Sequence, residues 1–278
     1  MISILIPTRG RRRGLERAVR SALQTADDPN CLQFVAYVDQ DDALTYFNFN
    51  EEFNLEVQFI IGPRIVLSNC WNKCAVKAVG DIFQQSNDDV RYQTKGWDSL
   101  VYEEFEKCPD KILLVHGSDG SSRPSGGQGK FGVHSFVSRR WVETLGYFTP
   151  AFFSSDFGDS WIGEVADCIS RRRYLPFVIE HLHPIFGKGE EDATYLQRLV
   201  RHSNDNVEQL YRDLAPLREV DIEKLKAAIA NPAAPRREQY VRRQDKQKMD
   251  TFNVNAAVKK SILAAAVGCS ASAIRRLS

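Results

Sequence analysis

A group of adjacent polar residues follows an apolar stretch in the first third of the sequence: Asn87, Asp88 and Asp89. Asp residues commonly cap helices and occupy turns, and that interpretation needs no ligand. Hard divalent cations such as Mg2+ or Mn2+, however, take oxygen ligands, few from the protein and several from phosphate and water. If the Asp pair faces a cleft that also contains Arg9 and Arg64, it could hold a metal against a diphosphate that a guanidinium clamps.

The elements that must position these residues alternate between strands and helices up to about residue 116. Short apolar runs predict strands at 2–6, at 34–38, at 57–61, directly before Asn87 and at 112–115. Amphipathic stretches predict helices at about 15–23, 68–79 and 96–107. This alternation predicts an α/β fold with a mostly parallel sheet and helices on both of its faces.

Four of the predicted strands end in polar or charged clusters. The clusters are Thr8-Arg9, 39–42, 87–89 and 116–119. Because ligands bind beyond the carboxyl ends of the strands in such sheets, parallel strands would bring these clusters to one edge. The sequence therefore predicts a binding site there, independently of any family resemblance.

The second half of the chain is less regular. Residues 117–132 are rich in Gly and Ser and predict a loop, which could be a lid or an ordinary surface loop. Helices are expected at 160–172, 193–214 and 221–230, and 231–235 reads as a linker. We expect three regions: a catalytic domain at 1–190, a helical extension with linker at 191–235, and a basic C-terminal segment at 236–278.

Composition limits the class of protein. The 43% hydrophobic and 26% charged residues are ordinary for a globular chain. Six scattered cysteines without a CxxC pair favour a reducing compartment. The sequence contains no apolar run of the roughly 18 residues that would span a bilayer, and no basic segment of a signal peptide at its start. We expect a cytoplasmic protein without a membrane span, in the host cytoplasm if the protein is viral.

The first half resembles inverting glycosyltransferases of the GT-A fold, in the large family (family 2-like) that includes cellulose and hyaluronan synthases and bacterial rhamnosyltransferases. The resemblance rests on the segment ISILIPTR at 2–9, on Asp39, on Arg64, on a helix containing Asn72, and on SNDD at 86–89, and it covers about residues 1–190. It implies a nucleotide-sugar donor, with UDP favoured. The donor-binding residues that it implies are Pro7, Thr8, Arg9, Asp39, Arg64, Asn72 and Asp88.

The resemblance also implies a metal and a general base. Asn87-Asp88-Asp89 stands where the family has its acidic D-x-D-type motif, and Asp89 is the metal ligand that we expect. His183 and His181 alternate in an extended stretch and could add a ligand for Mn2+ or Mg2+, although paired histidines in an apolar strand are more often structural.

Two carboxylates are candidates for the general base. Residues 132–148 are similar to the family's acceptor segment, and a catalytic carboxylate is expected after it. Asp156 and Asp159 are available there, and Asp159 is favoured because it opens a predicted helix. The alternative for Asp159 is a helix N-cap. A base is needed because an acceptor hydroxyl is a poor nucleophile until its proton is taken.

The C-terminal segment suggests nucleic acid as a partner. Its ten Lys and Arg against three Asp and Glu give 236–278 a charge of about +7. The end of this segment, 258–277, resembles a helix-turn-helix, although an Ala-rich helix that packs on the main domain is an equal alternative. The candidate DNA contacts are Arg242, Arg243, Lys259, Lys260, Arg275 and Arg276.

The sequence thus predicts a metal-dependent glycosyltransferase whose acceptor is a hydroxylated base in DNA, as in phage-type DNA glycosyltransferases. Three alternatives stay open. A soluble glycosyltransferase could act on a glycan or a protein, or the fold could serve as a DNA-binding module without catalysis. A nucleotidyltransferase would want a Gly-rich basic loop near the N-terminus, which 8–14 superficially offers.

Overall fold

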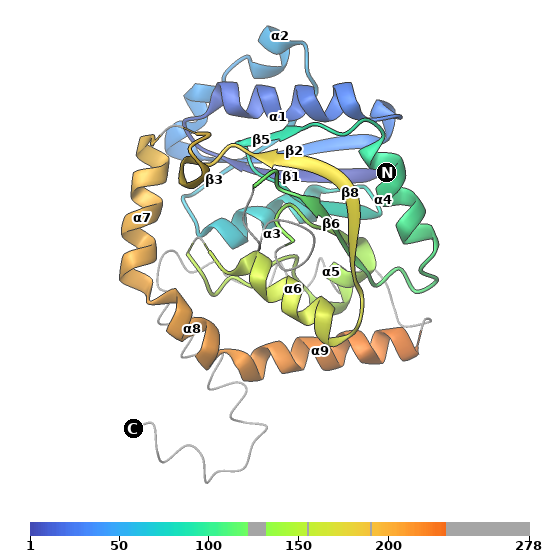
Figure 1. The fold of residues 1–278 in the computed structure, drawn as a ribbon. Coiled ribbons are helices and arrows are strands. Elements are labelled where there is room, and N and C mark those ends of the chain that lie inside the picture. Colours follow the sequence, from blue (N-terminus) through green and yellow to red (C-terminus); the bar gives the residue numbers. More distant parts are fainter. Residues whose placement is uncertain (122–131, 155, 190, 232–278) are drawn as a thin grey trace.

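The computed structural model describes residues 1–121, 132–154, 156–189 and 191–231. In this part of the chain an eight-stranded sheet has the order β3-β2-β1-β4-β7-β6-β8-β5 (Figure 1). The strands are β1 (Ile2–Thr8), β2 (Leu32–Asp39), β3 (Gln58–Gly62), β4 (Ile82–Gln85), β5 (Val90–Tyr92), β6 (Leu114–Ser118), β7 (Phe136–Ser138) and β8 (Arg172–His181). Strands β2, β1 and β4 are parallel neighbours, and β6 and β8 are also parallel to each other. Strands β7 and β5 run antiparallel to their partners, so the mostly parallel α/β sheet is confirmed.

Strand β1 shows why the sheet is covered on both faces. All seven of its residues are buried, as a continuous apolar run predicts for a central parallel strand. Ile2, Ile4 and Ile6 belong to one hydrophobic cluster, whereas Leu5 belongs to the other. Successive side chains of a strand point to opposite faces, so β1 contributes to two separate cores.

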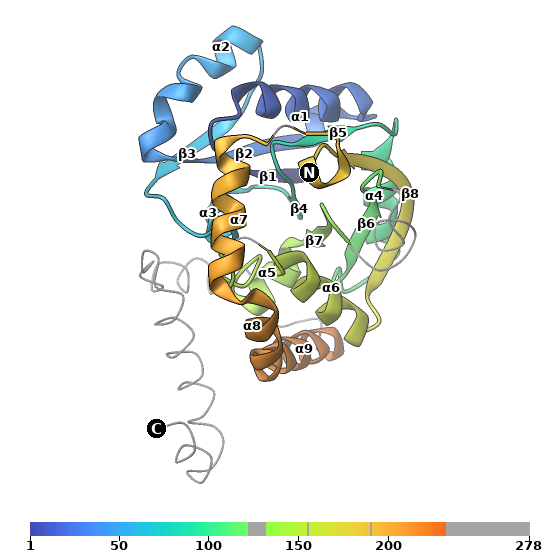
Figure 2. The same cartoon turned by 60° about the vertical axis from the view of Figure 1, so that its left-hand side comes forward.

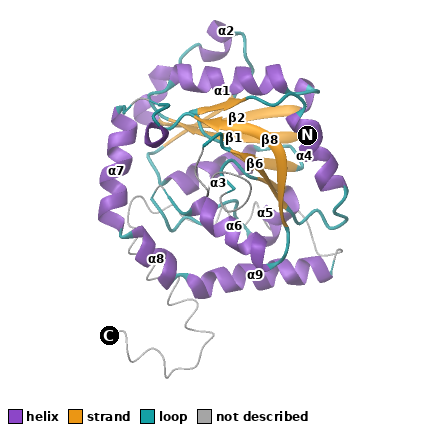
Figure 3. Ribbon diagram, in the orientation of Figure 1, coloured by secondary structure: helices purple, strands orange, loops and turns teal. Residues whose placement is uncertain are grey.

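Two layers of helices enclose the sheet, as Figure 3 shows. On one face, α1 (Arg12–Thr25) and α4 (Trp97–Glu106) contribute Leu15, Val19, Trp97 and Val101 to the core. On the other face, the helices α3 (Leu67–Lys77), α5 (Arg139–Leu145) and α6 (Gly158–Cys168) contribute the buried indoles of Trp71, Trp141 and Trp161. The short helix α2 (Phe49–Phe53) and three 3-10 turns, Pro29–Cys31, Gln40–Tyr46 and Pro184–Phe186, complete these layers.

The C-terminal helices run along the side and base of this body (Figure 2). They are α7 (Ala193–Asp205), α8 (Val207–Asp213) and α9 (Ala215–Ala230). The prediction of one helix over 193–214 was wrong, because Asn206 takes a left-handed conformation with φ of 43° and ends α7. The last helix begins at 215 rather than 221, since Pro216 fits its first turn. Ile222 and Leu225 bury α9 in the second core.

The helix predicted at 160–172 ends earlier, at Cys168. Strand β8 begins at Arg172, within the range where the helix was predicted. Ser170 makes the turn between the two elements in a left-handed conformation, with φ of 56°. This early ending has a consequence for the site, because it turns Arg172 toward α6, where it pairs with Asp167.

None of the helices in the described ranges is long and apolar enough to cross a membrane. Residues 122–131 of the predicted loop, residues 232–235 of the predicted linker and the basic segment 236–278 lie outside these ranges, and so do the six candidate DNA-contacting residues. The division into three regions at residues 190 and 235 stays a prediction.

Candidate functional site

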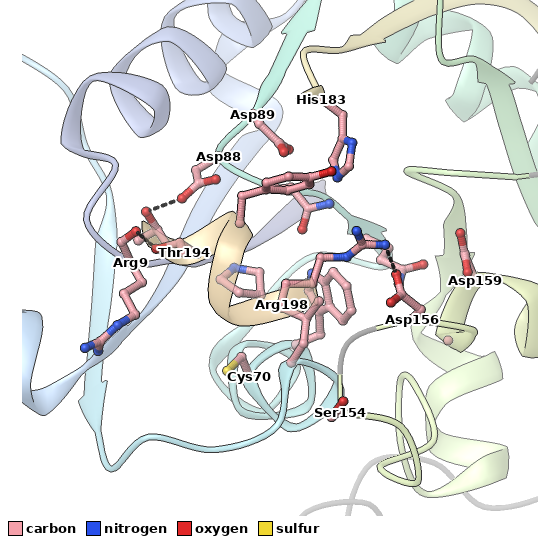
Figure 4. Close-up of a pocket in the computed structure, with 18 of the residues that line it drawn as sticks. Arg9, Cys70, Asp88, Asp89, Ser154, Asp156, Asp159, His183, Thr194 and Arg198 are labelled. Carbon is pink, nitrogen blue, oxygen red and sulfur yellow. Dashed lines mark hydrogen bonds and ion pairs between the residues drawn. The ribbon is translucent and has the colours of Figure 1, made fainter. Parts of the chain in front are cut away.

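A cleft of about 590 Å3 opens beyond the carboxyl ends of the strands. The polar clusters that end β1, β2 and β4 all line it, as does Asp119 after β6. Figure 4 shows Asp88 and Asp89 on one side and Asp156 and Asp159 on the other. The sequence-predicted residues that the cleft brings together are Pro7, Thr8, Arg9, Asp39, Arg64, Asp88, Asp89, Asp156, Asp159, His181 and His183.

Asn72 is the candidate donor-binding residue that does not line the cleft. Its side-chain oxygen accepts hydrogen bonds from the backbone amides of Phe148 and Thr149, at 2.8 and 3.0 Å. Its nitrogen donates to the Thr149 carbonyl at 2.8 Å. The buried Asn72 amide therefore joins α3 to the turn after α5. Nothing in the sequence indicated this structural role.

One end of the cleft is built around Arg9. Its guanidinium donates to Asp39 at 2.9 Å and to both oxygens of Asp41, at 2.5 and 2.6 Å. Burial raises the pKa of Asp39 although Arg9 opposes this shift. Arg64 lies 4.0 Å from Asp39 and donates to Gln197 of α7. This end offers carboxylates and guanidinium groups together, which suits a base and a phosphate.

Arg11 is a site residue that the sequence reasoning missed. Its side chain is 20% exposed and lies among three carboxylates. It donates to Asp192 at 2.5 and 2.9 Å and to Asp88 at 3.2 Å, and its Nη1 is 3.5 Å from Asp89. The signal was the basic run at 11–13, whose first residue directly precedes α1 and points back to the strand ends. Arg11 is a fixed cation at the acidic motif.

Both carboxylate oxygens of Asp88 accept hydrogen bonds from neighbouring side chains. Asp88 is buried and accepts a hydrogen bond from the Thr8 hydroxyl at 2.8 Å in addition to Arg11. Burial raises its pKa, although the charge of Arg11 opposes the shift. Gly14 of α1 lets this loop approach closely, since a Cβ at position 14 would stand 2.6 Å from the Asp88 carbonyl oxygen. The glycine therefore has a packing role rather than that of a nucleotide-binding loop.

Asp89 faces the histidines. His181 Nε2 lies 3.3 Å from Asp89 Oδ1, a buried oxygen with no other close polar partner in the described structure. Burial favours a raised pKa for Asp89, but His181 and Arg11 together bring its pKa below the usual range. The His183 ring packs on the His181 ring with centroids 5.0 Å apart. Burial lowers the pKa of His183 to about 4, so its imidazole is neutral and able to ligate at neutral pH.

These residues fit a divalent cation at Asp89 and not at Asp88. Within the described ranges, no three His, Cys, Asp or Glu side chains form a ready metal cage. A cation held mainly by phosphate and water needs only one or two protein ligands, however. The buried Oδ1 of Asp89 has only the His181 ring, itself a candidate ligand, beside it in the described structure. Both oxygens of Asp88 are already engaged by Thr8 and Arg11.

The opposite end of the cleft contains the two candidate bases. Asp156 is ion-paired with Arg198 of α7 at 2.6 Å, as Figure 4 shows. Asp159 accepts a hydrogen bond from the Ser160 amide at 2.8 Å. No cation pairs with Asp159 in the part of the chain that the structure describes. Burial, followed by the neighbouring charge of Asp156, raises its pKa. The N-cap of α6 is Phe157, so Asp159 is not the cap that the alternative interpretation required.

Helix α7 forms a wall of the cleft that the sequence did not suggest. Thr194 donates to the Arg9 carbonyl at 3.1 Å, and Arg198 reaches Asp156. Tyr195 and Arg201 also line the cleft. The amphipathic pattern of 193–205 predicted a helix but not which surface its polar side would meet, because the partners lie more than 40 residues away in the sequence.

Comparison with known proteins establishes the fold. No protein-family model and no curated protein sequence matches the chain. The mannosyltransferase PcManGT from Pyrobaculum calidifontis, solved with GDP-Man and Mn2+, superposes with a TM-score of 0.52 and 12% identity over 96% of this chain and 80% of that one. TarS 1–349 of S. aureus, solved with UDP, gives 0.48 and 15% over 63% of this chain, which spans 59% of the TarS fragment. The chain therefore has an α/β fold that resembles GT-A glycosyltransferases, as expected.

Proposed function

We propose that this chain is a metal-dependent glycosyltransferase that moves a sugar from a nucleotide-sugar donor to an acceptor hydroxyl. The observation that carries the proposal is the asymmetry of the cleft. Its one end joins Arg9, Arg11 and the Asp88-Asp89 pair, whereas its other end presents Asp159 without a cation partner in the described residues. The first arrangement suits a nucleoside diphosphate, and the second suits the removal of a proton.

The donor is proposed to lie with its base against Asp39 and its diphosphate between Arg11 and Arg64. A cation on Asp89, with His183 or His181 as a second ligand, would neutralise charge on the leaving diphosphate. The solved PcManGT complex, which contains GDP-Man and Mn2+, supports this class of donor and metal. We favour a UDP-sugar, in line with the resemblance of the 2–9 segment.

The chemistry is a single displacement at the anomeric carbon. The acceptor oxygen forms a bond to that carbon while the bond from carbon to the diphosphate oxygen breaks, and the electron pair leaves with the diphosphate. Asp159 takes the acceptor proton as the bond forms. Guanidinium groups at the Arg11 end stabilise the charge that develops there. Because base and leaving group stand at opposite ends of the cleft, the proposed outcome is inversion.

Hydroxylated DNA stays the predicted acceptor from the sequence, with a glycan or a protein as the alternative. The basic residues that support the DNA prediction lie outside the described ranges. The candidate base and the largely buried Asp89 carboxylate beside His181 favour an enzyme over a DNA-binding module without catalysis.

The full chain should be incubated with UDP-glucose, UDP-N-acetylglucosamine and GDP-mannose, with Mn2+ or with EDTA. We expect Mn2+-dependent release of nucleoside diphosphate from at least one donor, because water can replace the acceptor slowly. The chain should also bind the same nucleoside diphosphate in calorimetry. If no donor released a nucleoside diphosphate and no nucleoside diphosphate bound, the proposed function would be excluded.

A further inference from the structure

A second cavity, of about 200 Å3, lies beyond Asp159. Asp159 and Ser160 line both this cavity and the donor cleft. Its walls come from α6, from Arg172 at the start of β8, from Tyr211 of α8 and from Gly132. Figure 1 shows α6 and β8 next to each other. A carboxylate shared by two cavities can meet a donor on one side and a second molecule on the other.

Arg172 provides the cavity with an unused donor. Its side chain is only 10% exposed. Its Nε donates to His116 Nε2 at 3.1 Å and its Nη1 to Asp167 at 2.9 Å. Its Nη2 is buried and has no hydrogen-bond partner in the described structure. A buried N–H without a partner is costly, so a site that contains one is suited to a ligand oxygen.

The guanidinium is held firmly in this position. His116 accepts from Arg172 at Nε2, so its Nδ1 carries the proton and faces the Gly117 carbonyl at 3.2 Å. Burial and the charge of Arg172 lower the pKa of His116 to about 4, which keeps the ring neutral and able to accept. Asp167 fixes the other side of the guanidinium. Arg172 Nη2 is therefore a preorganised donor.

The charges around the cavity indicate what kind of molecule fits. Glu164 is paired with Arg218 at 3.2 Å and accepts from the Tyr211 hydroxyl. Asp167 is paired with Arg172. Asp159 is thus the lining carboxylate that has no cation partner in the described residues, and the cavity is close to neutral with a slight negative excess. A polyanion would bring its phosphates toward Asp159, Glu164 and Asp167 at an electrostatic cost.

We propose that this cavity is the acceptor subsite and that it takes the terminal unit of a neutral glycan; this inference rests on the proposed glycosyltransferase function. One hydroxyl oxygen of the sugar accepts a hydrogen bond from Arg172 Nη2. A neighbouring hydroxyl gives its proton to Asp159 as its oxygen bonds to the donor's anomeric carbon and the diphosphate leaves. A cavity of about 200 Å3 is below the usual range for drug-sized ligands, which suits one sugar ring.

The test uses the full chain with the donor that it hydrolyses and with methyl glycosides of glucose, galactose, mannose and N-acetylglucosamine as probes. We expect at least one glycoside to accelerate nucleoside diphosphate release and to become glycosylated. In Arg172→Met the KM for that glycoside should rise about 10-fold or more, because a hydrogen bond to a charged donor is lost. Donor affinity and slow hydrolysis without glycoside should not change.

Arg173→Met is the matched control, because Arg173 is 46% exposed and pairs with Glu104 outside the cavity. Gly163→Ala is a second test that removes no ion pair, since its Cβ would stand 3.7 Å from Arg172 Nη1 in ordinary contact. It should raise the glycoside KM several-fold by narrowing the cavity, and Arg172→Lys should recover part of the lost affinity.

The outcomes separate the two proposals. Donor hydrolysis without any effect of the glycosides, or an unchanged glycoside KM in both cavity variants, would overturn the subsite alone. Donor hydrolysis that only hydroxymethylated DNA accelerates would also overturn it and would support the DNA acceptor. A chain that neither binds nor hydrolyses any donor would refute the proposed function, and this inference with it.

Discussion

The two ends of the cleft hold their carboxylates in opposite ways. At the acidic end, Arg11 lies among Asp88, Asp89 and Asp192. At the other end, Asp159 has only the Ser160 amide as a hydrogen-bond donor in the described structure. Burial disfavours charge at both ends, but the Arg11 cation opposes the rise in the pKa of Asp88 and helps to bring the pKa of Asp89 below its usual range. Burial raises the pKa of Asp159 with no cation beside it in the described structure. The difference distinguishes the end around Asp88 and Asp89, which suits binding of a ligand, from the end around Asp159, which suits acceptance of a proton.

Replacing the uncompensated carboxylate is the strongest test of this contrast. Asp159→Asn should lower the rate of transfer about 1000-fold, because general base catalysis typically contributes 100- to 10000-fold. Calorimetric binding of the nucleoside diphosphate should stay within two-fold of the unaltered chain. The matched control is Asp156→Asn, whose carboxylate is already paired with Arg198. If Asp156→Asn were the more damaging change, the assignment of the base would be reversed.

Removing the Arg11 cation should destabilise the acidic end of the cleft. Arg11→Met leaves buried carboxylates without their partner and should lower the free energy of unfolding by about 3 kcal/mol. Urea denaturation would measure the loss, and Mn2+ should restore more stability to the variant than to the unaltered chain because it can replace the missing charge. Arg13→Met serves as the control, since Arg13 is 75% exposed, pairs with Glu16 and lies over the Phe53 ring, away from the acidic pair. Equal stability of the two variants would contradict the role of Arg11.

Asp89 and Asp88 should differ although they are adjacent. Asp89→Asn removes the proposed cation ligand and should lower kcat/KM about 100-fold, within the range for loss of a preorganised electrostatic group. Binding of Mn2+ in the presence of nucleoside diphosphate, measured by electron paramagnetic resonance, should weaken in parallel. Asp88→Asn keeps a side chain that can accept from Thr8 and should weaken Mn2+ binding less. Similar weakening in both variants would show that the pair acts as one ligand.

The smallest expected effect is a shift in pH dependence. The raised pKa of Asp159 means that its carboxyl loses its proton at a pH above the ordinary pKa of 3.8. The base works only when it is deprotonated, so kcat/KM should rise with pH and reach half its maximum above pH 3.8. In Asp156→Asn the half-maximal pH should fall slightly, because the charge of Asp156 contributes to the shift. A midpoint at or below 3.8 would contradict the partly buried setting of the base.

The fold followed closely from the sequence because local patterns determined it. The run at 2–6 was apolar except for Ser3, as expected for a strand covered on both faces, and the polar clusters after the strands met at one edge. The break at Asn206 was missed because the amphipathic pattern continues through it while the backbone does not. Asn can adopt the left-handed conformation but does not always do so, and hydrophobic periodicity contains no information about the backbone conformation of a single polar residue.

The site was predicted in part. Strand-end residues such as Arg9 and Asp89 were found because strand ends converge by topology. Arg11, Arg172 and Arg198 were missed because their roles depend on contacts between segments far apart in the chain, such as Arg11 with Asp192 and Arg172 with His116. Asn72 was overinterpreted, since nothing local distinguishes a buried amide that joins two segments from one that faces a ligand.

The approach of α1 to the acidic loop has a consequence for how this chain can vary. Position 14 has room for a hydrogen atom only, because any Cβ would collide with the Asp88 backbone oxygen at 2.6 Å, and backbone cannot move aside as a flexible side chain can. One residue earlier, Arg13 points into solvent and is replaceable. In a library of single substitutions across α1, glycine should thus be the sole survivor at position 14, even though it contributes no functional group to the cleft.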